Sequence, residues 1–258
     1  MKRLGTKVFG LSAAMLVTFV LMSDVVANEN IWAPGGDPDN PNEYANSANW
    51  SLGYYPTENS PGDSNVLINA AGDDRAILST NVGTWDRYIY RIRGGELDIL
   101  GGGSLRLENP DAGYNQITGS DGTAGKLNLK GGTFTFTGAS PEHDSLDLGT
   151  GGETGVINVE SGTLNAGRNL YIGASGDTDS PGHGEVNVYG GTVNFSWGQV
   201  ILDRQGAGGT SGVFYVHGSE PKRISGARGW TQKSHGTVKF GIDAEGVTPI
   251  EVVSGQGD

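Results

Sequence analysis

From residue 93 onward, the chain alternates apolar and polar positions in short stretches, and most of these stretches end in glycine. Alternation over a few residues is typical of a half-buried β-strand, whereas a helix would place apolar residues three and four positions apart. Five similar stretches recur at intervals of 30, 30, 29 and 28 residues. Their first apolar positions are Leu97, Leu127, Ile157, Val186 and Phe214. A nearly fixed period in this range indicates a repeat architecture.

Each repeat contains three strand-like pieces. The most regular piece reads KLNLKGGTF from residue 126, VINVESGTL from 156 and EVNVYGGTV from 185. A second piece covers residues 116–118, 145–149, 169–173 and 199–203, and a third follows the Gly-Thr pair, as in 134–136 and 193–195. Three short strands per repeat match one rung of a parallel β-helix, whose rungs stack about 4.8 Å apart. We therefore predict an all-β fold, a right-handed single-stranded parallel β-helix (β-solenoid) of about five rungs with inward-facing aliphatic stacks.

Asn128, Asn158 and Asn187 occupy the same place in successive repeats. We expect them to stack on the outer face and to hydrogen-bond along the axis, as amide ladders do in cross-β structures. An alternative is that the Asn and Thr rows form a flat ligand-binding face, of which an ice-binding array is a special case.

Glycine accounts for 45 of the 258 residues, about 17% against roughly 7% in ordinary proteins. With a regular period, this excess indicates many tight turns rather than disorder. We expect positive φ angles at the glycines that mark one corner of each rung. These glycines are Gly132, Gly162, Gly191 and Gly218.

The repeats divide the chain into four predicted segments. Residues 1–27 are a signal peptide, 28–92 an N-terminal capping region, 93–219 the solenoid repeats and 220–258 a closing segment. A stack of rungs needs its ends covered, and residues 28–92 are rich in aromatic residues. They include Trp32, Trp50, Tyr54, Tyr55, Trp85, Tyr88 and Tyr90. An alternative is that Trp50 and Trp85 belong to a sugar-stacking platform. Residues 237–243 and 246–250 are predicted to form a closing strand pair, and the sequence leaves open whether this segment is truncated.

The N-terminus has the pattern of an export signal. Lys2, Arg3 and Lys7 precede an apolar run over 11–22, and Ala27 completes a small-residue cleavage pattern. The run is shorter than the roughly 20 residues of a spanning helix, so we predict cleavage after Ala27 and a secreted or cell-surface bacterial protein. A retained membrane anchor is the alternative. The chain has no cysteine, so neither disulfides nor a Cys-based metal site stabilises it.

Cleavage there removes three of the 17 Lys and Arg residues and one of the 29 Asp and Glu residues, which leaves 14 and 28 and a net charge of −14. This charge argues against nucleic acid or an anionic membrane surface as partner, because both require cationic contacts. Extracellular polysaccharide or another surface protein stays open as a partner. The sequence predicts no cofactor, although weak Ca²⁺ binding by Asp37, Asp39 and Asn40 or by Asp177 and Asp179 stays open.

The repeats and the preceding Trp32, Asn49-Trp50-Ser51, Pro56 and Asp63 resemble Gly-rich secreted β-helix proteins of the planctomycete and verrucomicrobium type. The ending over 238–250 is similar to the region that follows the repeats in such proteins. Relatives of this kind often carry autotransporter-like repeats or a PEP-type sorting tail, and no sorting-tail pattern is recognised in this sequence. The resemblance implies an architecture and says little about activity.

β-Helices also carry polysaccharide lyases and glycoside hydrolases, so a catalytic function is an alternative. A hydrolase needs two carboxylates about 5–9.5 Å apart, and Asp147 and Asp203, with Arg204 beside the latter, stand in roughly comparable places of different rungs. The histidines lack metal-ligand spacing, with His143 and His183 in predicted loops, His217 at a corner and His235 elsewhere. We assign no catalytic, cofactor-binding or metal residue.

The sequence thus favours a non-catalytic structural or adhesion-type solenoid of the cell surface or matrix. A carbohydrate-active β-helix enzyme and a non-catalytic glycan-binding module are the two alternatives.

Overall fold

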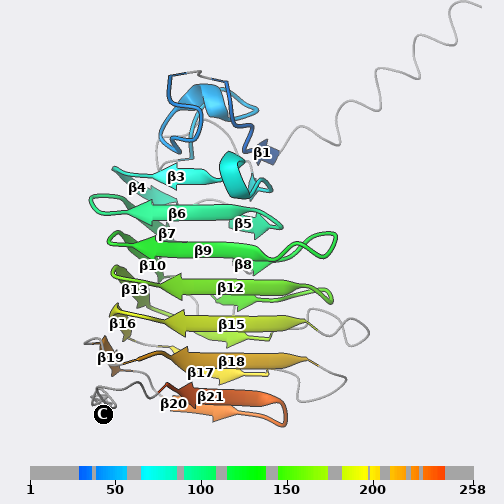
Figure 1. Ribbon diagram of the computed structural model, residues 1–258, viewed down its shortest axis with the longest axis vertical. Helices are drawn as coiled ribbons and strands as arrows, with labels where there is room; N and C mark the ends of the chain where they lie inside the picture. The colour runs from blue at the N-terminus through cyan, green and yellow to red at the C-terminus, as the bar shows by residue number, and fades with distance from the viewer. Residues whose placement is uncertain are drawn as a thin grey trace, which may run out of the picture.

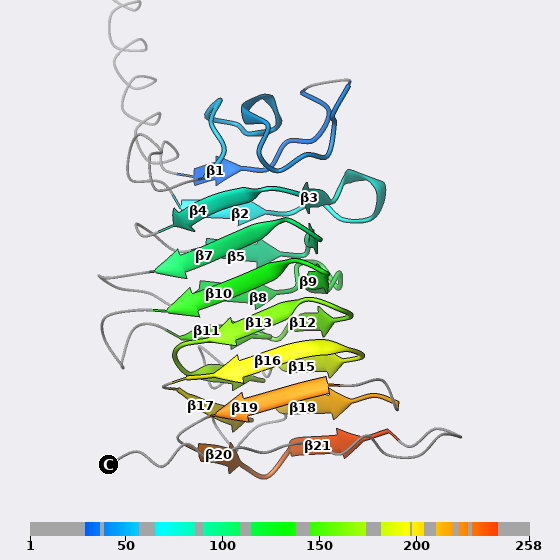
Figure 2. The ribbon, with the colours of Figure 1, turned by 90° about the vertical axis from the view of Figure 1, so that its left-hand side faces the viewer.

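The computed structural model describes residues 29–36, 39–56, 65–85, 90–108, 115–137, 145–173, 182–196, 198–203, 210–218, 222–226 and 229–241. The strands of these residues stack in three parallel sheets along one axis (Figures 1 and 2). Every pairing between named strands is parallel. The predicted all-β parallel solenoid is therefore confirmed.

The sheets are named here by their number of strands. The eight-stranded sheet contains β1 (Glu29–Ile31), β2 (Asn65–Ile68), β5 (Tyr90–Arg93), β8 (Asn115–Thr118), β11 (Leu146–Leu148), β14 (Leu170–Ile172), β17 (Gln199–Leu202) and β20 (Gly229–Gln232). The seven-stranded sheet contains β3 (Ala76–Leu78), β6 (Glu96–Leu100), β9 (Gly125–Lys130), β12 (Thr154–Val159), β15 (His183–Val188), β18 (Ser211–Val216) and β21 (Gly236–Phe240). The six-stranded sheet contains β4 (Asn81–Trp85), β7 (Ser104–Glu108), β10 (Thr133–Thr137), β13 (Thr163–Ala166), β16 (Gly191–Phe195) and β19 (Lys222–Gly226). Two short 3₁₀ turns, η1 (Ser47–Asn49) and η2 (Gly72–Asp74), complete the described elements.

The register of the seven-stranded sheet follows the sequence repeat. Leu97 pairs with Leu127, Leu127 with Ile157, Ile157 with Val186 and Val186 with Phe214. All five side chains are at most 1% exposed, so each coil adds its apolar residues to one continuous core. The same sheet extends beyond the five repeats, to β3 before them and β21 after them.

Strands β1 to β4, and most of β5, fall within residues 28–92. The sheets therefore begin before residue 93. Trp32, Tyr44 and Trp50 come from the loop after β1 and pack edge-to-face, with ring centroids 5.2 Å and 5.0 Å apart. All three are buried, and their loop lies at one end of the stack, beyond β3 (Figure 1). Its role as a cap stays a prediction.

The corner glycines have two different reasons for being glycine. Gly191 and Gly218 have φ angles of 73° and 57°, so the prediction holds at these positions. It is wrong at Gly132 and Gly162, which do not have a positive φ. A Cβ on Gly132 would lie 2.3 Å from Ile99 Cγ2, and one on Gly162 would lie 2.3 Å from the Gly132 carbonyl oxygen. Close approach of successive coils, rather than backbone conformation, excludes a side chain there.

Residues 237–240 lie in β21 and pair in parallel with β18. The second half of the predicted closing pair, together with residues 1–27, lies outside the described residues. In the part of the chain that the structure describes, no helix has the length and apolar character needed to cross a membrane.

Candidate functional site

Asn128, Asn158 and Asn187 form a hydrogen-bonded ladder along the outer face of the seven-stranded sheet. The side-chain amide of Asn158 donates to Asn128 Oδ1 at 2.8 Å, and that of Asn187 donates to Asn158 Oδ1 at 3.2 Å. His217 continues the row with a contact of 3.2 Å between Nε2 and Asn187 Oδ1. The predicted amide ladder is therefore present. Its amides bond to one another, so the row is self-satisfied rather than presented to a ligand.

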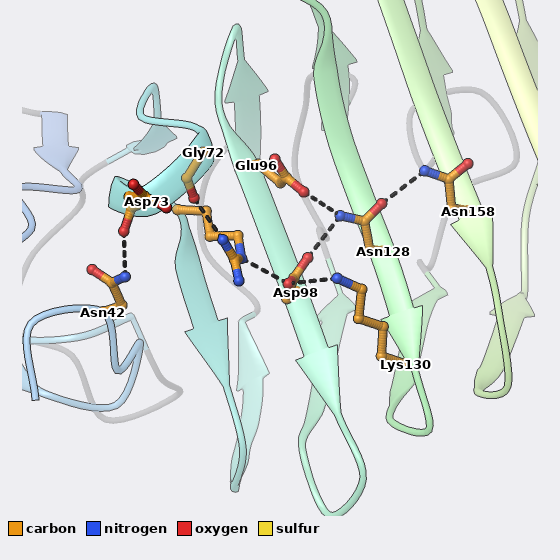
Figure 3. A network of polar contacts seen from close by, with 9 residues as sticks. Asn42, Gly72, Asp73, Glu96, Asp98, Asn128, Lys130 and Asn158 are labelled. Atoms are coloured by element: carbon orange, nitrogen blue, oxygen red, sulfur yellow. Dashed lines mark hydrogen bonds and ion pairs between the residues drawn. The ribbon is translucent and has the colours of Figure 1, made fainter.

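The ladder ends at a buried carboxylate (Figure 3). The Asn128 amide donates to Asp98 Oδ1 at 2.7 Å and to Glu96 Oε1 at 2.6 Å. Asp98 Oδ2 accepts from Arg75 Nε at 2.8 Å and from Lys130 Nζ at 2.9 Å. Burial alone would raise the pKa of Asp98, but the hydrogen bonds from Lys130 and Asn128 and the Lys130 charge lower it below its usual 3.8. This cluster is a charged terminus for the ladder.

A second ladder runs along the six-stranded sheet. Asn165 donates to Thr135 Oγ1 at 3.1 Å, Asn194 donates to Asn165 Oδ1 at 2.8 Å, and Ser225 donates to Asn194 Oδ1 at 2.7 Å. The sequence analysis did not single out this row, although Asn165 and Asn194 lie 29 residues apart, within the repeat interval.

The structure does not bring Asp147 and Asp203 together as a catalytic pair. Through Tyr171, Asp147 aligns with Ile201 and not with Asp203. Their strands β11 and β17 are separated by β14, which alone places them about 9–10 Å apart along the axis. Asp203 also lies two residues further along its strand. The expectation that the two aspartates hold comparable places is therefore wrong.

Asp203 instead has a structural position at a corner of the coil. Its φ is 58°, and it follows Leu202 as Gly149 and Gly173, with φ of 69° and 77°, follow their strands. The carboxylate is fully buried. It accepts from the Thr210 hydroxyl and, at 2.9 Å, from the His235 backbone N–H. Aspartate tolerates this left-handed conformation better than most residues, and its neighbour Arg204 lies outside the described residues.

His183 is the first residue of β15 rather than a loop residue, and it joins a serine and a glutamate. Its Nδ1 lies 2.6 Å from Ser211 Oγ and its Nε2 lies 2.8 Å from Glu185 Oε1. These are the residue types of an acyl-transfer triad. However, the Ser211 backbone N–H donates to the Gly182 carbonyl at 3.0 Å, so it is not free to stabilise an oxyanion. Sequence analysis missed the cluster because its members come from two strands, β15 and β18.

A pocket of about 270 Å³ opens on the outer face of the eight-stranded sheet. Its lining includes Arg91 and Arg93 of β5, Gln116 and Thr118 of β8, and Glu153 from the turn before β12. The Arg91 Nε is buried and has no hydrogen-bond partner. Two cations and one carboxylate therefore face a common space in an otherwise acidic protein.

No known protein family, curated protein or solved structure matches the chain. The assignment of a site therefore rests on geometry alone. Among the described residues, no group of three His, Asp or Glu side chains is arranged to hold a metal ion. Asp37, Asp177, Asp179 and His143 lie outside those residues.

The two ladders are structural, and in the His183 cluster the Ser211 backbone N–H is already hydrogen-bonded to Gly182. The pocket of Arg91 and Arg93 is the candidate that brings two cations to the lining of one cavity. The sequence analysis did not single out Arg91 and Arg93. Once residues 90–93 are assigned to a strand, the alternation places both arginines on the same face, which is unusual in an acidic chain.

Proposed function

We propose that the protein is a non-catalytic, structural or adhesion-type solenoid of the bacterial cell surface or extracellular matrix. One observation carries this proposal, namely the ladder from Asp98 through Asn128, Asn158 and Asn187 to His217. Its amide groups link successive coils along the outer face. A surface whose polar groups satisfy one another suits a scaffold that must stay folded without disulfides.

The N-terminal sequence supports export. Three cations precede the apolar run, and the small residues before Asn28 fit a cleavage site. The net charge of −14 after cleavage suits an exported chain, because excess charge of one sign keeps proteins apart in solution. The Gly-rich repeat also supports a relationship to the extracellular β-helix proteins that it resembles.

Expression of the full chain in a Gram-negative host tests the export step. We expect a product that starts at Asn28 in the periplasm or medium, identified by mass spectrometry. Leu16→Arg, which places a charge in the apolar run, should leave the precursor inside the cell. An uncleaved chain that stays cytoplasmic with Leu16 intact would refute the extracellular role.

The exported protein should release neither reducing ends nor unsaturated sugars from acidic or neutral polysaccharides. Turnover that disappears with Asp147→Ala or Asp203→Ala would replace the scaffold proposal with the carbohydrate-active enzyme. The two measurements are independent, so export and catalysis are tested separately.

A further inference from the structure

We infer that the pocket beside β5 and β8 binds one carboxylate-bearing sugar unit, with Arg91 and Arg93 holding the carboxylate. This inference rests on the proposed function, because it names a ligand for an adhesion-type surface. It concerns residues that belong to neither ladder, so it is tested without disturbing the scaffold.

The backbone places the donors on one surface. Arg91 and Arg93 alternate along β5 with the buried Ile92 between them, so both side chains point outward. By register, Gln116 lies beside Arg91 and Thr118 beside Arg93 on the adjacent strand β8. Spacings of about 7 Å along a strand and about 4.8 Å between strands put the four side chains around one small area.

The two arginines differ in their burial and in their partners among the described residues. The Arg91 Nε is buried without a hydrogen bond, although Arg91 Nη1 lies 3.7 Å from Glu29 Oε1. Among the described residues, the Arg93 guanidinium takes part in no hydrogen bond or ion pair. The Arg93 side chain is exposed, and a guanidinium binds a planar carboxylate through two parallel N–H groups. Arg93 is therefore accessible to an acceptor from outside the protein, and Arg91 adds a second positive charge to the lining of the same pocket.

Glu153 decides between classes of anion. It lines the same pocket as the arginines, and a Cβ on Gly119 would lie 2.8 Å from its Oε2, which places the carboxylate close to the β8 end. Because Glu153 itself carries a negative charge, it repels a dianion such as phosphate more strongly than a ligand with a single charge. The carboxylate instead accepts hydrogen bonds from hydroxyl groups. A sugar acid carries one negative charge, which suits the two arginines, together with hydroxyl donors, which suit Glu153.

The rim and the size of the pocket limit what enters. Thr118 Oγ1 donates to the Thr150 carbonyl at 2.8 Å, while the Thr150 N–H donates back to Thr118 Oγ1 at 3.2 Å. This pair fixes the turn that carries Glu153. A volume of about 270 Å³ lies just below the range of about 300–1,000 Å³ typical of small-molecule sites. One sugar ring is the appropriate size, and the negative charge of the whole chain disfavours a long polyanion.

Isothermal titration of the exported protein with glucuronate and galacturonate tests the inference, with glucose and inorganic phosphate as comparison ligands. We expect saturable binding of at least one sugar acid and neither glucose nor phosphate binding as tightly. Arg93→Ala should weaken binding at least tenfold. Arg91→Lys should also weaken it, because lysine keeps the charge but lacks the planar guanidinium that pairs with a carboxylate.

Arg106→Ala is the matched control, because Arg106 is an exposed arginine of the six-stranded sheet and its loss changes the net charge equally. It should bind as tightly as the unchanged protein. Failure of both sugar acids to bind, tighter binding of phosphate, or equal losses in Arg93→Ala and Arg106→Ala would each overturn the inference. None of these outcomes bears on export or on ladder stability, so the scaffold proposal would stand or fall separately.

Discussion

The side-chain amide of Asn158 donates a 2.8 Å hydrogen bond to Asn128 Oδ1, although the two residues are 30 positions apart in the chain. They face each other in parallel register on β12 and β9. The Oδ1 atom of Asn158 in turn accepts a 3.2 Å hydrogen bond from the side-chain amide of Asn187. Each interior member of the row therefore links the coil before it to the coil after it.

Replacing Asn158 with alanine should lower the free energy of unfolding by about 1–3 kcal/mol. The substitution removes two hydrogen bonds and leaves the Asn128 oxygen and one N–H of the Asn187 amide without these partners, while Asn187 keeps its 3.4 Å bond to Glu185 Oε2. Urea denaturation followed by circular dichroism measures the change. Glu160→Ala, one residue past β12 and exposed, is the control and should shift the midpoint little. Equal midpoints for the two variants would show that the ladder contributes nothing to stability.

Asp98 should make the protein sensitive to acid. Its folded-state pKa lies below the usual 3.8, so its ion pairs stabilise the fold fully above about pH 5 and are lost as the pH falls through the folded pKa. Asp98→Asn should be less stable than the unchanged protein at pH 7, because Arg75 and Lys130 lose their carboxylate. The difference in thermal midpoint between the two proteins should shrink between pH 5 and pH 2. A difference that stays constant over this range would contradict the assigned pKa direction.

Gly132→Ala should destabilise the protein severely, by about 3 kcal/mol or more, or prevent folding. A Cβ there would lie 2.3 Å from Ile99 Cγ2 and 2.5 Å from the Leu100 carbonyl oxygen, and backbone does not yield cheaply. In Gly101→Ala the new Cβ would meet no atom within 4 Å, and Gly101 does not have a positive φ. This control should fold normally. Guanidinium denaturation measures both, and similar midpoints would refute the close-packing argument.

Trp50→Ala should cost about 3–5 kcal/mol of stability, which is typical for a large buried aromatic. Trp50 is 3% exposed, and its Nε1 donates to the Tyr44 carbonyl at 2.8 Å. A ring in this position cannot stack on a sugar, so the platform interpretation fails for Trp50. The side chain of Trp85 lies outside the described residues. Leu52→Ala, at an exposed apolar side chain, is the control. A Trp50→Ala protein as stable as Leu52→Ala would contradict the burial.

Much of the fold was predictable because one physical constraint acts on every repeat. In a parallel stack, equivalent residues of successive coils are hydrogen-bonded neighbours, so a period of about 30 residues specifies long-range pairing directly. The period alone pairs Leu127 with Ile157 and Asn128 with Asn158. Strands β1 to β4 were not predicted in this way, because the repeated sequence pattern does not extend to them.

The amino-acid sequence alone determined the parallel solenoid, its inward rows and the amide ladder, since each follows from a residue type that recurs at the stacking period. Only the tertiary structure decided that Gly132 is glycine for lack of space, that Asp203 holds a corner away from Asp147, and that Glu153 faces Arg91 and Arg93. These features depend on how closely the turns approach neighbouring coils, and the sequences of these turns do not recur at the repeat period. Local sequence constrains such approaches weakly, because packing against other coils sets their geometry.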